Sequence, residues 1–145
     1  MPELQGLIVG LLAGILMGIV SEIGYQIGIF KSSLFIIDGS FVTNILGVKG
    51  NRGKVYTFGI PLHLITSMVF GGVYKSMTDL LNWNPHAVWI LTSYSIILWL
   101  SMVLVALPIS GQGFLGKKGG RFAWLEQLLL HIVYGTGLWL VLLII

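Results

Sequence analysis

Three ionisable side chains lie inside long apolar stretches of this sequence, where a charge is costly. They are Glu22, His63 and His131. Such groups usually face a partner, a cavity or a pathway rather than lipid. Imidazole binds haem iron and transition metals and titrates near neutral pH, and a carboxylate can bind a metal or carry a proton. These three residues therefore define the candidate chemistry.

The composition indicates which solvent surrounds these groups. Hydrophobic residues make up 56% of the 145 residues, charged residues only 9%, and the mean hydropathy is +0.95. Soluble domains carry about 25% charged residues. The chain has too few charges to cover a surface that faces water, so most of its surface must face lipid. The absence of cysteine excludes disulfides, thiolate ligands and cysteine nucleophiles.

Four segments reach the ~20 apolar residues that are needed to cross ~30 Å of hydrocarbon. We predict an all-α integral membrane protein in which residues 1–145 form a single domain, an antiparallel bundle of four transmembrane helices. The predicted spans are residues 4–30, 55–77, 86–108 and 123–145. A short similarity between residues 68–74 and 132–137 further suggests two repeated hairpins.

The predicted loop at residues 31–54 is unusually apolar. Two apolar runs, at residues 34–37 and 41–46, flank an Asp38–Gly39 turn signal. Neither run is long enough to span a membrane. The segment can lie in the membrane interface, dip into the bundle, dock on a partner subunit, or form a loop with buried apolar anchors.

The positions of the basic residues predict the orientation. Seven of the eight lysines and arginines fall in the predicted loops at residues 31–54 and 109–122, namely Lys31, Lys49, Arg52, Lys54, Lys117, Lys118 and Arg121. The positive-inside rule assigns these loops to the cytoplasm. We therefore predict a multi-pass protein of the cell membrane with both termini outside. Cations in loops beside apolar runs favour anionic membrane lipids, and no nucleic acid, as partners.

Four glycines recur at intervals of four in the first predicted span: Gly6, Gly10, Gly14 and Gly18. In lipid there is little hydrophobic force between helices, so small residues that let two backbones approach closely favour their association. We predict that this glycine ridge is a packing surface. Glu22 continues the same ridge, which predicts that it points toward the bundle.

The three ionisable groups are predicted to lie at one depth. His63 and His131 each lie eight residues after the predicted start of their spans, and Glu22 lies eight residues before the predicted end of the first span at Phe30. At ~1.5 Å per residue, all three are ~12 Å inside the basic face. We predict that they converge in one polar layer inside the bundle.

The first chemistry that this layer suggests is ligation of a b-type haem by His63 and His131. Cations near the membrane surface would then hold the propionates, and the candidates are Arg52, Lys54 and Arg121. Glu22 would handle protons at a quinone site beside the haem. Further polar residues near this depth are Ser67, Ser101 and Gln127. A haem- or quinone-linked electron-transfer subunit is the leading functional prediction.

Two alternatives stay open. Glu22, His63 and His131 could bind a divalent metal ion or relay protons, as in a metal-ion or proton-coupled transporter. The same groups could instead form a hydrogen-bond network that fixes helix register, in an accessory subunit of a larger membrane complex. No catalytic serine or paired carboxylates support an independent enzymatic activity. We expect homo-oligomers or other membrane subunits as protein partners.

One short motif carries a resemblance. Glu22 within Ser21-Glu22-Ile23-Gly24 resembles the coupling glutamate of small multidrug transporters. The resemblance implies proton-coupled transport. Those transporters are shorter, and they lack both the histidine pair and the long first loop.

Overall fold

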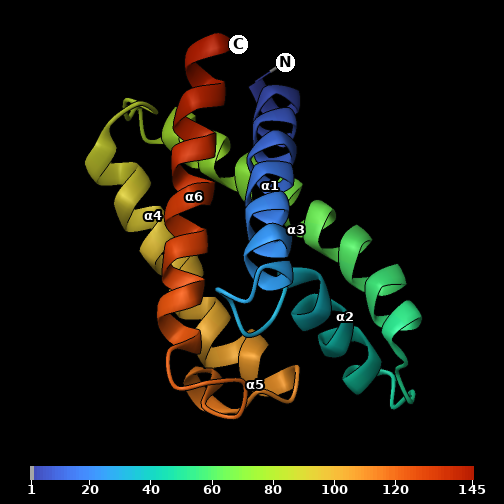
Figure 1. The fold of residues 1–145 in the computed structure, drawn as a ribbon. Helices are drawn as coiled ribbons and strands as arrows, with labels where there is room; N and C mark the ends of the chain where they lie inside the picture. Colours follow the sequence, from blue (N-terminus) through green and yellow to red (C-terminus); the bar gives the residue numbers. More distant parts are fainter. Residues whose placement is uncertain (1) are drawn as a thin grey trace.

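The structure is a computed structural model that describes residues 2–145, and all regular structure in that range is helical (Figure 1). Four helical segments are long and apolar enough to cross a membrane, which confirms the predicted all-α membrane fold. They are α1 (Pro2–Gln26), α3 (Arg52–Leu80), the segment Val88–Ile109 and α6 (Ala123–Ile144). The segment Val88–Ile109 consists of α4 (Val88–Ser101), a π-helical turn η1 (Met102–Ala106) and α5 (Leu107–Ile109).

The helices form a row rather than a regular square. Figure 1 shows α1 and α6 side by side at the centre, with α3 passing obliquely behind α1 and α4 flanking α6. Both termini lie at one end of the molecule, together with the connection from α3 to α4. The segments before α3 and before α6 lie at the opposite end. This second end therefore holds the loops that are rich in lysine and arginine.

The span boundaries differ from the predicted ones by a few residues. The first helix ends at Gln26 rather than near residue 30, because Gly28 takes a positive φ of 80° and the chain turns back. The helix α3 is longer than predicted at both ends. Its start is set by Asn51, whose side-chain oxygen accepts a hydrogen bond from the backbone N–H of Lys54 at 2.9 Å. Such N-caps satisfy donors that the first helical turn leaves free.

The predicted turn at Asp38–Gly39 is wrong, because a helix, α2 (Leu34–Ile45), runs through both residues. Two serines hold the start of this helix. The Ser33 hydroxyl accepts a hydrogen bond from the N–H of Phe35 at 3.2 Å, and the Ser21 hydroxyl of α1 accepts one from the N–H of Leu34 at 2.8 Å. With 12 residues α2 is too short to span, and it packs against α3.

The glycine ridge of α1 packs against α3, as the sequence predicted. A Cβ atom built on Gly10 would lie 2.3 Å from the backbone oxygen of Ser67, and one built on Gly71 would lie 2.3 Å from the Cα of Gly10. Real Cβ atoms do not approach so closely. The two backbones are therefore in direct contact, and only glycine allows this crossing.

A second glycine contact joins α2 to α3. A Cβ atom on Gly39 would lie 1.8 Å from the backbone oxygen of Val55, and one on Gly59 would lie 1.8 Å from that of Phe35. Gly39 adjoins Asp38, and Gly59 lies one helical turn before His63. This crossing therefore sets the distance between those two side chains.

Three buried tyrosines, Tyr74, Tyr94 and Tyr134, lie in the interior of the bundle. The Tyr74 hydroxyl donates to the backbone oxygen of Pro85 at 2.8 Å, that of Tyr94 to Phe70 at 2.6 Å, and that of Tyr134 to Ser67 at 2.7 Å. Each bond satisfies a polar group that burial would otherwise leave unpaired. The tyrosines thereby tie α3 to α4 and α6.

Candidate functional site

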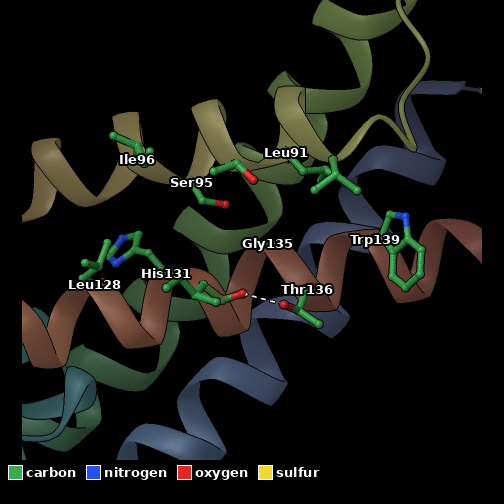
Figure 2. A pocket seen from close by; sticks show the side chains of 11 residues that line it. Leu91, Ser95, Ile96, Leu128, His131, Gly135, Thr136 and Trp139 are labelled. Atoms are coloured by element: carbon green, nitrogen blue, oxygen red, sulfur yellow. Dashed lines mark hydrogen bonds between the residues drawn. The ribbon is translucent and has the colours of Figure 1, made fainter.

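His131 lies on α6 at one end of a groove between α6 and α4, with Trp139 at the other end (Figure 2). The residue is only 8% exposed. Its Nδ1 lies 2.7 Å from the backbone oxygen of Gln127, one turn earlier on the same helix. A carbonyl oxygen can only accept, so Nδ1 carries the hydrogen. In the neutral ring the lone pair is therefore on Nε2.

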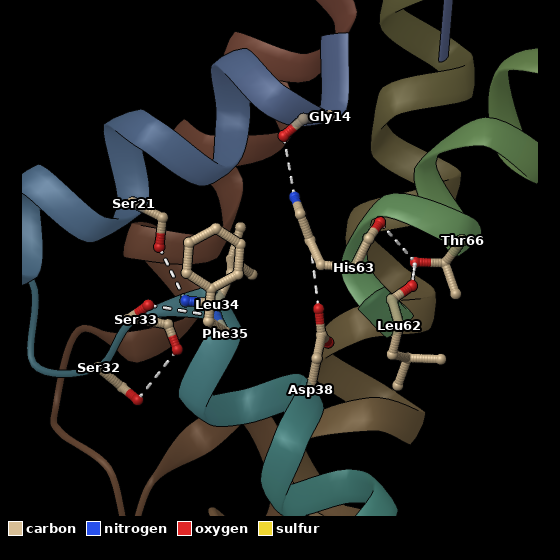
Figure 3. Close-up of polar contacts among 10 residues, drawn as sticks. All are labelled: Gly14, Ser21, Ser32, Ser33, Leu34, Phe35, Asp38, Leu62, His63 and Thr66. Carbon is tan, nitrogen blue, oxygen red and sulfur yellow. Dashed lines mark hydrogen bonds and ion pairs between the residues drawn. The ribbon is translucent and has the colours of Figure 1, made fainter. Parts of the chain in front are cut away.

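His63 on α3 is 4% exposed and is held from two sides (Figure 3). Its Nε2 lies 3.0 Å from the backbone oxygen of Gly14 on α1, and its Nδ1 lies 3.2 Å from Oδ2 of Asp38 on α2. The edge of the ring meets Phe35, with the ring centroids 5.5 Å apart. Three helices therefore fix this imidazole in one orientation.

The two contacts of His63 determine how many protons the pair holds. The Gly14 oxygen can only accept, so Nε2 carries a hydrogen. Contact between Nδ1 and Asp38 then requires one more proton, on either the carboxyl or the imidazole. With neither protonated, the lone pair of Nδ1 would face a carboxylate across 3.2 Å. The geometry thus describes an acid–imidazole pair that shares one proton.

Asp38 is placed where its ionised form is costly. Its side chain is only 16% exposed, and burial raises the pKa of the Asp38 carboxyl above its ordinary value, while the bond to His63 opposes part of that rise. An ionised carboxylate loses solvation in such a place unless a cation compensates. The pair therefore favours keeping the shared proton.

The two histidines meet at one cavity of about 70 Å³. Residues of α1, α2, α3, α4, η1 and α6 line it. The polar residues among them are Asp38, His63, Thr66, Ser67, His131 and Tyr134. A water molecule needs ~10–15 Å³ of such volume and two to four polar partners. The cavity therefore has room and partners for a few waters between the rings. His131 also lines the groove of Figure 2, so it borders both spaces.

Of the three groups predicted to converge, the structure brings together the two histidines and places Glu22 elsewhere. The Glu22 carboxylate accepts hydrogen bonds from the side-chain amide of Gln26 at 2.7 Å and from the Tyr56 hydroxyl at 3.0 Å. It is partly exposed and does not line the cavity between the histidines.

The other predicted residues divide between the interior and the surface. Ser67 lines the cavity, and Gln127 is 2% exposed with its side-chain oxygen lacking a partner within residues 2–145. Ser101 is exposed and donates to the backbone oxygen of Ile97. The predicted propionate ligands are all exposed on the segments at the start of α3 and before α6, namely Arg52, Lys54 and Arg121.

A haem between the histidines does not fit this arrangement. Axial ligation needs a free nitrogen on each ring, but both nitrogens of His63 already have protein partners. The cavity of about 70 Å³ is also far below the ~300 Å³ of even a small ligand pocket. Electron transfer through a haem at this place is therefore not the function we propose.

The predicted metal site is not assembled either. Among residues 2–145, no three histidine, aspartate or glutamate side chains gather closely enough to hold a metal ion. The position that the sequence assigned to Glu22, beside the histidines, is taken by Asp38.

Asp38 is a residue of the candidate site that the sequence did not predict. It lies in an apolar run, and the reasoning that singled out Glu22 applies to it equally once that run is taken as a helix. The Asp-Gly pair instead indicated a turn.

No protein-family model matches this chain, and no curated protein or solved structure is significantly similar to it. A proposal about function therefore rests on the geometry of the site.

Proposed function

We propose that this protein is a small proton-coupled membrane transport protein, with Asp38 and His63 as its proton-binding site. The observation that supports the proposal is the buried acid–imidazole pair, whose contacts at 3.0 and 3.2 Å require one shared proton. Ionisable groups buried in membrane proteins commonly mark proton relays. A structural network needs no titratable partner at this place, because a neutral amide would serve as well.

The surroundings of the pair support proton exchange. A cavity that is lined by both histidines and has room for water supports His131 as the next group to accept a proton, since its neutral ring has a lone pair on Nε2. Two groups that interact so closely titrate as a unit rather than separately. A proton can therefore leave the pair toward α6 without passing through lipid.

The division of the pair between helices suggests how protonation is coupled to movement. Asp38 belongs to the short α2, whereas His63 and the Gly14 oxygen belong to membrane helices. When the proton leaves, the carboxylate and the lone pair of Nδ1 repel each other, which favours a shift of α2 away from α3. At its closest point, the crossing through Gly39 and Gly59 brings backbone against backbone, so a shift of α2 would change that contact first.

Proton flux into liposomes tests the proposal. We expect wild-type protein, reconstituted with a pH-sensitive dye inside and a potassium–valinomycin potential, to carry protons faster than protein-free vesicles. Asp38→Asn should reduce this flux by ~10-fold or more, because the amide cannot exchange a proton. Asp79→Asn is the matched control, since Asp79 is a 40% exposed carboxylate paired with Lys75. Flux through folded Asp38→Asn at the wild-type rate, or wild-type flux no greater than that of empty vesicles, would contradict the proposal.

The proposal also includes the membrane in which the protein lies and its orientation in that membrane. The concentration of cations at the end opposite the termini supports a cell-membrane protein with that end in the cytoplasm. Because the chain has no cysteine, a single introduced cysteine can show on which side of the membrane its residue lies. A membrane-impermeant maleimide added to intact cells should label Leu81→Cys, in the connection on the terminal side, and leave Lys118→Cys unlabelled until the cells are opened. The reverse pattern would contradict this orientation.

A further inference from the structure

A second space, separate from the proton-binding pair, lies between α4 and α6. It is a groove of about 340 Å³, within the ~300–1,000 Å³ typical of small-molecule sites. Most of its lining is apolar, including Leu91, Leu128 and Trp139. Figure 2 shows the side chains of both helices along it. Of the residues that the proton-coupled function uses, this groove shares only His131.

The groove opens toward the membrane rather than toward water. Ile96 on α4 and Ile132 on α6 line it and are 42% and 52% exposed, on a surface that faces lipid. A molecule dissolved in the bilayer can therefore enter sideways between the helices. A water-soluble molecule would have to cross hydrocarbon first.

Three polar groups in the groove have no partner in the protein. Within residues 2–145, the Ser95 and Thr92 hydroxyls and Nε2 of His131 make no hydrogen bond to another protein group. Ser95 and His131 are only 7% and 8% exposed. Neither Ser95 Oγ nor His131 Nε2 is fully enclosed by protein, so a molecule in the groove can reach them.

Gly135 lets the Ser95 side chain of α4 approach the backbone of α6 closely. A Cβ atom at this position would lie 2.3 Å from the Ser95 hydroxyl oxygen, so any other residue would press on it. Gly135 lies one helical turn after His131, and its backbone faces α4 (Figure 2). The Ser95 hydroxyl therefore packs against α6 one helical turn from His131.

The tautomer of His131 determines what this partner must offer. Because Nδ1 donates to the Gln127 oxygen at 2.7 Å, the neutral ring presents a lone pair at Nε2. The matching group on a ligand is a hydrogen-bond donor. Ser95 can then donate to the oxygen of the same group, because a hydroxyl both donates and accepts. A hydroxyl group on an apolar body meets both requirements.

We propose that the groove between α4 and α6 binds a lipid-soluble alcohol or phenol, with its hydroxyl donating to Nε2 of His131 and accepting from Ser95. The apolar body lies along Leu91 and Trp139. A lipid acyl chain would fill the apolar part, but it would leave Nε2 and the serine hydroxyl unpaired. The hydroxyl is therefore the group that makes the site selective.

The test compares two probes that differ only in the donor. 4-Hexylphenol and its methyl ether, 4-hexylanisole, are titrated into protein in lipid nanodiscs, and the ¹⁵N signal of His131 Nε2 is followed by NMR. We expect the phenol to shift this signal and to bind ~10-fold more tightly than the ether, as loss of one buried hydrogen bond implies. Equal affinities for the two probes, or no shift with the phenol, would overturn the proposal.

Two tryptophan variants provide a matched control. Ile96 lines the groove and the neighbouring Ile97 does not, and both face lipid. Ile96→Trp should fill the groove and weaken phenol binding ~10-fold or more, whereas Ile97→Trp should leave it unchanged. Equal binding by both variants would also overturn the proposal. Asp38→Asn should lose proton flux but retain phenol binding. Failure of this inference changes the phenol binding, and failure of the proton proposal changes the flux, so the two can be distinguished.

Discussion

Gly71→Ala is expected to break the crossing of α1 and α3 and to lower the free energy of unfolding by about 3 kcal/mol or more. The new methyl group would lie 2.3 Å from the Cα of Gly10 and 2.5 Å from its nitrogen. Both are backbone atoms, which cannot move aside as the end of a side chain can. The helices must separate, and Ser67 and His63 move with α3 away from Gly14.

Gly72→Ala is the matched control for this prediction. A Cβ atom there would lie 3.1 Å from Cδ2 of Leu7, the flexible end of a side chain, so the substitution should cost less than about 1 kcal/mol. Denaturant unfolding in detergent micelles, followed by circular dichroism, measures both variants. If Gly71→Ala is as stable as Gly72→Ala, the helices do not cross through backbone contact.

Stability is expected to fall with rising pH because of Asp38. Burial raises the pKa of this carboxyl in the folded protein above the ~3.9 of an unfolded chain. At a pH between the unfolded and folded pKa values, the folded state binds more protons than the unfolded state. The stabilisation by the bound proton therefore has its full value at a pH below the unfolded pKa. It is lost as the pH rises through the folded pKa, with a slope of up to ~1.4 kcal/mol per pH unit.

Asp38→Asn isolates this contribution. The asparagine amide can donate to Nδ1 of His63 as the protonated carboxyl does, so the variant should fold and should lack this part of the pH dependence. The free energy of unfolding is measured for wild type and variant from pH 4 upward, in steps of ~0.5 pH unit. The wild-type value minus the variant value, plotted against pH, is the difference curve. Asp79→Asn should keep the wild-type slope. A difference curve that rises with pH would mean that protonated His63 stabilises the carboxylate, and the raised pKa would be wrong.

Much of the fold follows from local properties of the chain. Four runs of apolar residues long enough to cross hydrocarbon can only be helices, because lipid offers the backbone no other hydrogen-bond partner. The glycines of α1, spaced by four, lie on one helix face because of helix geometry. That face is a packing surface as predicted, and its partner is α3. The burial of His63 and His131 follows from the cost of exposing imidazole to lipid.

The composition of the candidate site depended on contacts between distant segments. Depth along a span predicted that Glu22 would join the histidines, but depth does not determine the direction in which a side chain points, and Glu22 bonds to Tyr56 instead. Asp38 reaches His63 because Gly39 and Gly59 let α2 approach α3 closely. Neither glycine reveals its partner by sequence spacing.

The sequence alone thus determined the solvent, the number of spans and the buried imidazoles, since each depends on the polarity of a residue and its near neighbours. The tertiary structure alone decided which acid accompanies His63, where His131 faces, and that a groove remains beside Ser95. Those features depend on how helices cross, and a crossing is set by backbone contacts between residues far apart in the chain.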